Sequence, residues 1–351
     1  MHPAAALCKM IRFPAGKSMR KSGVMKKTLL LAASLLSAAF LMVRPALAGP
    51  NRPNGDEDRH YAGRGVTMMM DGDLDGAVAV AQQIEQKDPD SPLGYILEAN
   101  TTWWRIYYTS ANLIDPDVFD VANMDATPYD SHFEDLDRVA IHKAEVLVHN
   151  REDLAYSLLY EGFAYALRAR LDGLHDRDLP TARAGKKMRG LLLDALQLDP
   201  TLADAYLGLG IYNYFVDTLS SIVKILSVFI GLPGGSRTEG LNQLQICADK
   251  GELASAEAKF YLGKDYSRNS EKQYDKSIRL FTELQEEFPH NPLWPMLIGS
   301  VNFRMGNAKH GEELYREVYQ STAGKNSDVN KAVHKAATEA LQRLHPDQKF
   351  Q

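Results

Sequence analysis

The segment DGDLDG, which begins at Asp71, has the residue types of a calcium-binding loop. Asp71, Asp73, Asp75 and Gly76 match loop positions 1, 3, 5 and 6, but position 12 is Gln82 where such loops need a bidentate Glu. The same segment also suits a tight turn between two helices, with the second helix beginning next to Gly76. We favour the turn and expect no bound metal at this segment.

Other residues with reactive side chains are isolated. Cys247 is the single Cys after residue 48, and a lone Cys in an apolar helical context is typically a small buried residue. His142 and His149 are seven residues apart, too far along a helix to share a metal without a third ligand. The GLPGGSR segment that ends at Arg237 lacks the lysine and spacing of a phosphate-binding loop. We expect no cofactor and no enzyme activity. The alternative is an enzyme whose active site is assembled from residues that are distant in sequence.

The N-terminus has the layout of an export signal. Residues 25–48 combine a basic start, an apolar run and a final Ala-Leu-Ala, which is typical of a cleavable signal peptide. Residues 1–24 are interpreted as an over-extended start, and residues 49–58 as a flexible linker. We expect cleavage between Ala48 and Gly49 and a periplasmic or secreted protein. An uncleaved membrane anchor is the alternative.

The charge of the mature chain excludes one class of partner. The whole chain has 40 basic and 45 acidic residues, but eight of the basic residues and none of the acidic residues lie in residues 1–48. Residues 49–351 therefore carry 32 basic and 45 acidic side chains, a net charge of −13. Such a chain repels nucleic acid and anionic membranes, so we expect no nucleic-acid partner.

A repeated pattern underlies the rest of the chain. Three prolines that end helical segments are each followed, ten residues later, by a small residue within a new apolar segment: Pro89 and Ala99, Pro200 and Gly210, Pro289 and Gly299. This register resembles the tetratricopeptide repeat, a 34-residue unit of two helices. In that family the small residue lets the first helix pack closely on the second, and the proline ends the unit.

The resemblance covers residues 59–345. Small residues at 65, 99, 162, 210, 263 and 299 mark about six units, and their separations of 34, 63, 48, 53 and 36 residues imply inserts. The resemblance implies an all-α, right-handed solenoid with two long inserts, at about 107–131 and 216–236. The segment NKAVHKAATEALQRL would form a C-terminal capping helix, followed by a tail at 346–351.

The fourth unit carries a second, weaker resemblance. GLGIYNYF, an apolar segment and GLPGGSRTEGLNQLQ are similar to the insert-bearing tetratricopeptide proteins of the inclusion-body-clearance family. Asn213, Arg237, Gly240 and Leu241 fit that pattern, whereas Ser236 replaces an acidic residue. The similarity implies shared architecture.

The apolar stretch SSIVKILSVFIGLPGG within the second insert raises the question of membrane contact. Its purely apolar part is too short to cross a bilayer, and Asp217 and Lys224 would be costly inside one. We expect a helix buried in protein, with membrane-surface contact as the alternative.

The preferred function is a non-enzymatic adaptor that binds a peptide or protein segment in the concave groove of the solenoid. The residues predicted to line that groove are Asn100, Trp103, Trp104, Tyr160 and Tyr214. The aromatic residues have a second interpretation, in which the inserts fold over them and bury them. The alternative function is a carrier of apolar ligands, or a membrane-surface protein, that uses residues 216–235.

Overall fold

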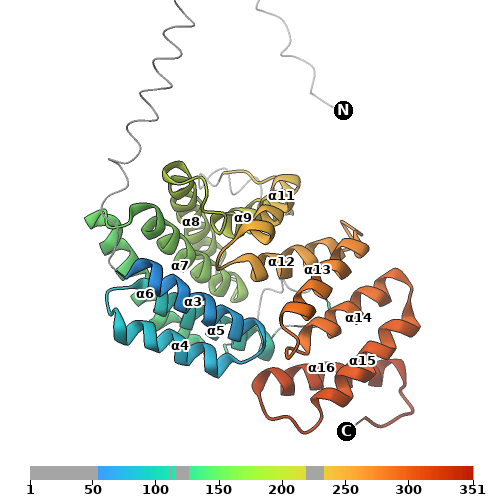
Figure 1. Cartoon of the computed structure of the whole chain (residues 1–351). Helices are drawn as coiled ribbons and strands as arrows, with labels where there is room; N and C mark the ends of the chain where they lie inside the picture. Colours follow the sequence, from blue (N-terminus) through green and yellow to red (C-terminus); the bar gives the residue numbers. More distant parts are fainter. Residues whose placement is uncertain (1–53, 111, 116–125, 219–232, 351) are drawn as a thin grey trace, which may run out of the picture. The chain divides into compact units, whose positions relative to one another are not determined.

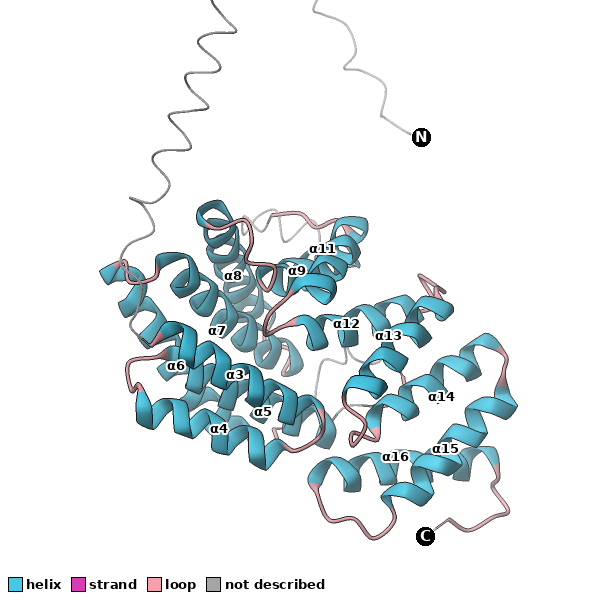
Figure 2. Ribbon diagram, viewed as in Figure 1, coloured by secondary structure: helices cyan, strands magenta, loops and turns pink. Residues whose placement is uncertain are grey.

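The computed structural model describes residues 54–110, 112–115, 126–218 and 233–350. This described part of the chain contains thirteen α-helices and no β-strand (Figures 1 and 2). The predicted signal peptide and the apolar stretch at 219–232 lie outside it. The helices are α3 (Gly55–Met70), α4 (Leu74–Lys87), α5 (Pro92–Ser110), α6 (Asp130–Asn150), α7 (Leu154–Leu174), α8 (Asp178–Leu198), α9 (Ala205–Thr218), α11 (Arg237–Lys250), α12 (Ser255–Ser267), α13 (Tyr274–Glu287), α14 (Leu293–Met305), α15 (Ala308–Thr322) and α16 (Asp328–Leu344).

Each helix packs on the next along the chain, and several alternate helices also touch. The alternate contacts join α3 to α5, α5 to α7, α7 to α9, and α14 to α16. This arrangement is that of a helical-repeat array, in which each helix pair buries its apolar side against its neighbours. None of the described helices is both long and apolar enough to cross a bilayer.

The predicted proline positions mark helix ends. α4, α8 and α13 each stop two residues before the prolines at 89, 200 and 289. A proline cannot continue a helix because it lacks an N–H and clashes with the preceding turn. The sequence pattern therefore located these three boundaries correctly.

The small residues at the repeat positions permit close helix contacts. A Cβ atom on Gly162 would lie 2.5 Å from the side chain of Leu192, and one on Gly263 would lie 2.7 Å from Phe281. A larger residue would push the two helices of each pair apart. The expectation that these positions must be small is confirmed.

The predicted turn at DGDLDG is present. The Asp73 side chain accepts a hydrogen bond from the Gly76 N–H (2.9 Å) and so caps the start of α4. Gly72 adopts a φ of +89°, a left-handed conformation that favours glycine. The carboxylate of Asp71 accepts from the backbone N–H of His290, and Asp75 pairs with Arg105.

The last helices of the array return to the first. The Asn291 side-chain amide donates to the Met70 carbonyl (2.8 Å) and lies 3.1 Å from the Tyr108 hydroxyl. Arg105 on α5 pairs with Asp328 at the start of α16, 2.8 Å away, and α16 packs on α5 (Figure 1). The predicted capping helix is thus present, and it contacts the N-terminal helices as well as α15.

Helices α9 and α11 approach unusually closely at two glycines. A Cβ atom on Gly240 would lie 2.6 Å from the Tyr214 nitrogen and 2.7 Å from the Gly210 carbonyl oxygen. The Asn213 amide donates to Gln243 (2.8 Å), and Asp217 accepts from the Arg237 N–H. The residues of the second resemblance therefore hold these two helices together.

We expect Gly240→Ala to lower the free energy of unfolding by about 3 kcal/mol, because backbone atoms face the added methyl group and cannot move aside. Gly190→Ala is the matched control. Gly190 is exposed on α8 with nothing within 4 Å of the added atom, so its replacement should stabilise by about 0.5–1 kcal/mol. Urea unfolding followed by circular dichroism measures both. Equal effects of the two substitutions would show that the α9–α11 contact is not tight.

Candidate functional site

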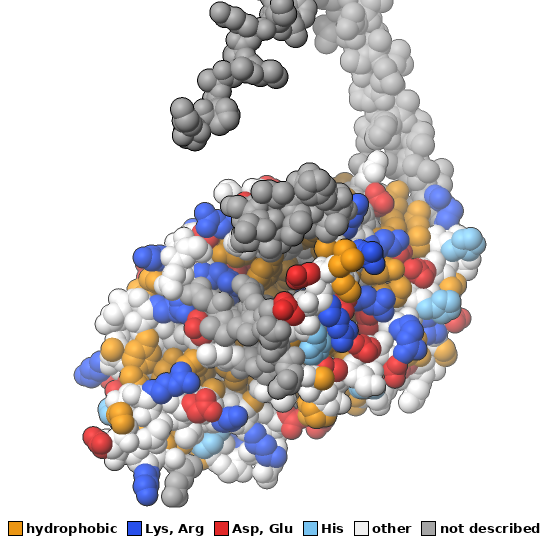
Figure 3. Space-filling view, turned by 180° about the vertical axis from the view of Figure 1, so that it is seen from behind, with side chains coloured by type: hydrophobic (Ala, Val, Ile, Leu, Met, Phe, Trp, Pro, Cys, Tyr) orange, Lys and Arg blue, Asp and Glu red, His pale blue; other side chains and the backbone are white. Residues whose placement is uncertain are grey.

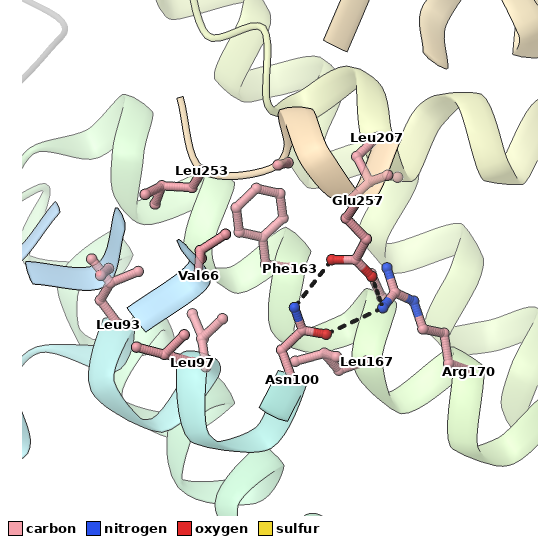
Figure 4. A pocket seen from close by; sticks show the side chains of 15 residues that line it. Val66, Leu93, Leu97, Asn100, Phe163, Leu167, Arg170, Leu207, Leu253 and Glu257 are labelled. Atoms are coloured by element: carbon pink, nitrogen blue, oxygen red, sulfur yellow. Dashed lines mark hydrogen bonds and ion pairs between the residues drawn. The ribbon is translucent and has the colours of Figure 1, made fainter. Parts of the chain in front are cut away.

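A cavity lies among alternate helices of the array. Its walls come from α3, α5, α7, α9 and α12 together with the turn before α12 (Figure 4). The lining residues are Ala62, Val66, Leu93, Ile96, Leu97, Asn100, Phe163, Ala166, Leu167, Arg170, Leu207, Gly208, Leu253, Ala254 and Glu257. Twelve of these fifteen have no polar side-chain group, so the cavity favours an apolar guest.

The cavity is small and partly open. Its volume is about 60 Å³, and one water needs about 10–15 Å³ by the same measure, so there is room for about four waters. Leu97 and Leu167 are buried in the wall, whereas Val66, Phe163 and Leu253 are half-buried. A single aliphatic side chain fits this space better than a cofactor, which needs roughly 300 Å³ or more.

Three polar side chains close one end of the cavity (Figure 4). The Arg170 Nη1 lies 2.6 Å from Glu257 Oε1, and the Asn100 amide donates to Glu257 Oε2 at 3.1 Å. Arg170 Nη1 also lies 3.4 Å from Asn100 Oδ1, which completes a closed triangle. The side chains of Arg170 and Glu257 are only 12% and 6% exposed, so the ion pair is held away from water.

The electrostatics of this triangle favour its charged form. Burial tends to lower the pKa of Arg170, but the charge of Glu257 and the hydrogen bond to it outweigh burial, and the pKa is raised. The Arg170 guanidinium also lies 5.2 Å from the ring centre of Tyr261. Burial is the largest cause that raises the pKa of that phenol. The triangle thus offers a guest fixed polar groups next to an apolar wall.

The structure places the predicted groove residues in two different settings. Asn100 lines the cavity, while Trp103, Trp104, Tyr160 and Tyr214 are buried, with at most 5% of their surface exposed. Only Asn100 is therefore positioned to touch a guest.

Trp104 belongs to an aromatic cluster in the core. Its ring centre lies 5.0 Å from that of Phe260 on α12 and 5.4 Å from that of Tyr107 on α5. Phe260 in turn lies 6.2 Å from Trp294 on α14. Among the described residues, helices of the array itself bury these rings, whereas the second interpretation assigned that role to the inserts.

Tyr160 and Tyr214 are also held by internal partners. Burial raises the pKa of the Tyr160 phenol, with Arg59 acting in the opposite direction. The guanidinium of Arg59 lies 3.8 Å from the ring centre of the neighbouring Tyr156. The Tyr214 hydroxyl lies 3.3 Å from Glu271 Oε1. Tyr214 thus joins α9 to the turn between α12 and α13.

Arg170, Glu257 and Phe163 were not predicted from the sequence. The sequence contained one signal for the two charged residues. Arg170 and Glu257 each lie on the apolar side of the first helix of a repeat unit. That signal is weak because most such charges lie at a solvated edge. Only the packing of α7 against α12 brings Arg170 and Glu257 together.

The remaining motifs, where the structure describes them, have internal partners or are buried. Cys247 is fully buried, and burial raises the pKa of its thiol well above the usual range. Ser236 caps α11 by accepting from the Glu239 N–H, and the Tyr212 hydroxyl donates to the Pro233 carbonyl. Within the described ranges, no three His, Cys, Asp or Glu side chains are placed to hold a metal ion.

No family model matches the chain, and no curated protein matches it.

We expect Trp104→Ala to lower the free energy of unfolding by about 3–5 kcal/mol, because it leaves a large cavity in the aromatic cluster. The control is Leu179→Ala on α8, where the side chain is 44% exposed and its loss should cost under about 1 kcal/mol. Thermal unfolding followed by circular dichroism compares them. A Trp104→Ala protein as stable as the control would place this ring outside the core.

Arg170→Met should destabilise the protein by about 3–5 kcal/mol, because it leaves Glu257 as an unpaired buried charge. The double substitution Arg170→Met with Glu257→Met should recover at least half of that loss, since apolar side chains suit the cavity wall. Urea unfolding of the wild type, both single variants and the double variant gives the coupling energy. Additive effects would mean that the two side chains are not paired.

Proposed function

We propose that this protein is an exported, non-enzymatic tetratricopeptide scaffold that holds an extended segment of another protein on its inner face. In this proposal six helix pairs, from α3–α4 to α14–α15, form a right-handed array capped by α16. The export proposal rests on the signal-like residues 25–48 and on cleavage after Ala48.

The observation that carries the proposal is the position of the cavity. All five helices that line it are the first helices of successive pairs, the side on which a helical-repeat array forms its extended binding surface. A hollow that spans several pairs suits a segment lying across them. A pocket within one pair would not.

The chemistry of the cavity indicates how such a segment would bind. One aliphatic side chain of the partner would enter between Leu97 and Leu167, in contact with Phe163 and Val66 at the rim. The neighbouring backbone would exchange hydrogen bonds with Asn100, whose amide can donate or accept. Burying one aliphatic side chain contributes about 1.5–3 kcal/mol, which is enough for an anchor but needs flanking contacts for tight binding.

The charge of the chain adds a preference among partners. Residues 49–351 carry a net charge of −13, which favours segments with basic residues beside the anchor. On the face drawn in Figure 3, acidic and basic side chains are interspersed. The preference for basic segments therefore rests on the total charge and is sensitive to salt.

The test uses immobilised twelve-residue peptides that carry one Leu, Ile or Met in a Ser- and Lys-rich background, and the same peptides with Ser at that position. We expect binding to the aliphatic peptides only. Ala166→Phe should fill the cavity and weaken binding at least tenfold, because Ala166 lines it. Lys186→Phe is the control, because it adds the same ring at an exposed position of α8, away from the cavity, and should leave binding unchanged.

Equal binding of aliphatic and Ser peptides, or full binding by Ala166→Phe, would contradict the proposal. Phosphatidylcholine vesicles provide the comparison with the alternative function. The apolar-ligand carrier would be supported in place of the scaffold by two results together. The wild-type protein would bind vesicles but not peptides, and Ala166→Phe would abolish the vesicle binding.

A further inference from the structure

Two glutamates from neighbouring helices meet at the contact between α4 and α5. A Cβ atom on Gly94 would lie 2.7 Å from Glu85 Cγ, so the Glu85 side chain lies directly over this glycine. Glu98 follows Gly94 by four residues and therefore lies on the same side of α5, one turn further along. The missing side chain at position 94 gives Glu85 the room to reach Glu98.

Glu98 connects this pair to solvent. Glu98 is 4% exposed, and its Oε1 lies 3.0 Å from His132 Nε2 on α6. The His132 side chain is 57% exposed. This imidazole therefore links the Glu98 carboxylate to the solvent.

One oxygen of the Glu85 carboxyl lacks a hydrogen-bond donor. Its Oε1 is buried and has no hydrogen-bond partner among the described residues. The neighbouring Glu98 offers only acceptor oxygens when it is ionised, so two ionised carboxylates would repel each other with no donor between them. One proton between them converts the repulsion into a hydrogen bond, because a protonated carboxyl donates.

We propose that Glu85 and Glu98 share one proton in the folded protein, and that this proton holds α4 and α5 together so that the first helix pair loosens as the pH rises. The inference is independent of the proposed function. It makes the N-terminal part of the array sensitive to pH near neutrality.

Every neighbouring charged group is consistent with this assignment. The pKa of Glu85 is raised to about 7, mainly by burial and then by the charge of Glu98 and the hydrogen bond to it, while Lys143 on α6 acts to lower it. Tyr95 on α5 faces the same pair, and its pKa is raised by burial and by both glutamates. Lys143 does not overcome burial and the charge of Glu98, and the His132 imidazole lies beside Glu98.

The sign of the pH effect follows from the raised value. The pKa of Glu85 is higher in the folded protein than in the unfolded chain, where it is about 4.5. The proton therefore stabilises the folded state fully below about pH 4.5, and that contribution is lost as the pH rises through about 7. Between pH 5 and pH 8 the folding equilibrium constant should fall on the order of tenfold to a hundredfold from this site.

The experiment compares wild type, Glu85→Gln and Glu339→Gln by urea unfolding across pH 5 to 8.5. Glutamine at position 85 keeps a donor for Glu98 at every pH, so the pH dependence assigned to this site should disappear. Glu85→Gln should then be more stable than wild type above pH 7 and similar to it at pH 5. Glu339 lies exposed on α16, and Glu339→Gln should retain the wild-type profile.

Other carboxylates contribute to the wild-type slope, because burial also raises the pKa of Asp137 to about 6. The difference between wild type and Glu85→Gln removes that contribution. Hydrogen exchange of peptides from residues 74–110, measured at pH 5.5 and pH 8, locates the effect. Faster exchange at pH 8 in wild type, but not in Glu85→Gln, is the expected result.

Two results would overturn the proposal. One is a Glu85→Gln profile that parallels wild type throughout the pH range. The other is a Glu85 carboxyl that titrates below pH 5.5 in the wild-type protein, measured by carbon NMR of its side-chain carboxyl. The NMR titration needs no variant, so the test holds even if Glu85→Gln folds poorly.

Discussion

The burial of the aromatic face of α5 against α12 is the constraint on which the other features depend. Trp104 and Tyr107 pack on Phe260, and Phe260 packs on Trp294 of α14. These contacts join the beginning of the array to its end. Later helices of the array thus cover the side of α5 that carries Trp104. The cavity beside Asn100 is a hollow lined by the first helices of the pairs among the described residues.

Polar contacts supplement this apolar core at the same junction. Asn291 bonds to Met70 and Tyr108, and Arg105 pairs with Asp328. Such contacts contribute modestly to stability, because each exchanges a hydrogen bond with water for one within the protein. Their main effect is on geometry, since an amide or guanidinium satisfies its partners in only a few orientations. They fix where the last helices lie on the first.

Buried ionisable groups recur at the helix contacts of this protein. Arg170 and Glu257 are paired, whereas Glu85 and Glu98 carry the same charge and need a proton to coexist. The difference matters physically because desolvation penalises every charge, and only an opposite charge or a bound proton offsets it. The first arrangement is stable over a wide pH range, and the second is stable only where the proton stays bound. One repeated fold thus contains both a fixed polar contact and a pH-dependent one.

The sequence alone determined the all-α class, the helix ends before Pro89, Pro200 and Pro289, and the need for glycine at 162, 210, 263 and 299. These features are local, because a proline or an absent side chain acts on its own turn and on the adjacent helix. The turn at Asp73 was recognised for the same reason.

The candidate site depended on tertiary structure. Asn100 was predicted, but its two partners are distant in sequence. Arg170 lies 70 residues after Asn100, and Glu257 lies 87 residues after Arg170. The three side chains meet only through helix packing. The exposure of Trp103 and Trp104 could not be read from their repeat positions, because those positions identify a side of the helix and not what covers it. The packing of α12 on α5, two helices that lie far apart in the sequence, decides that.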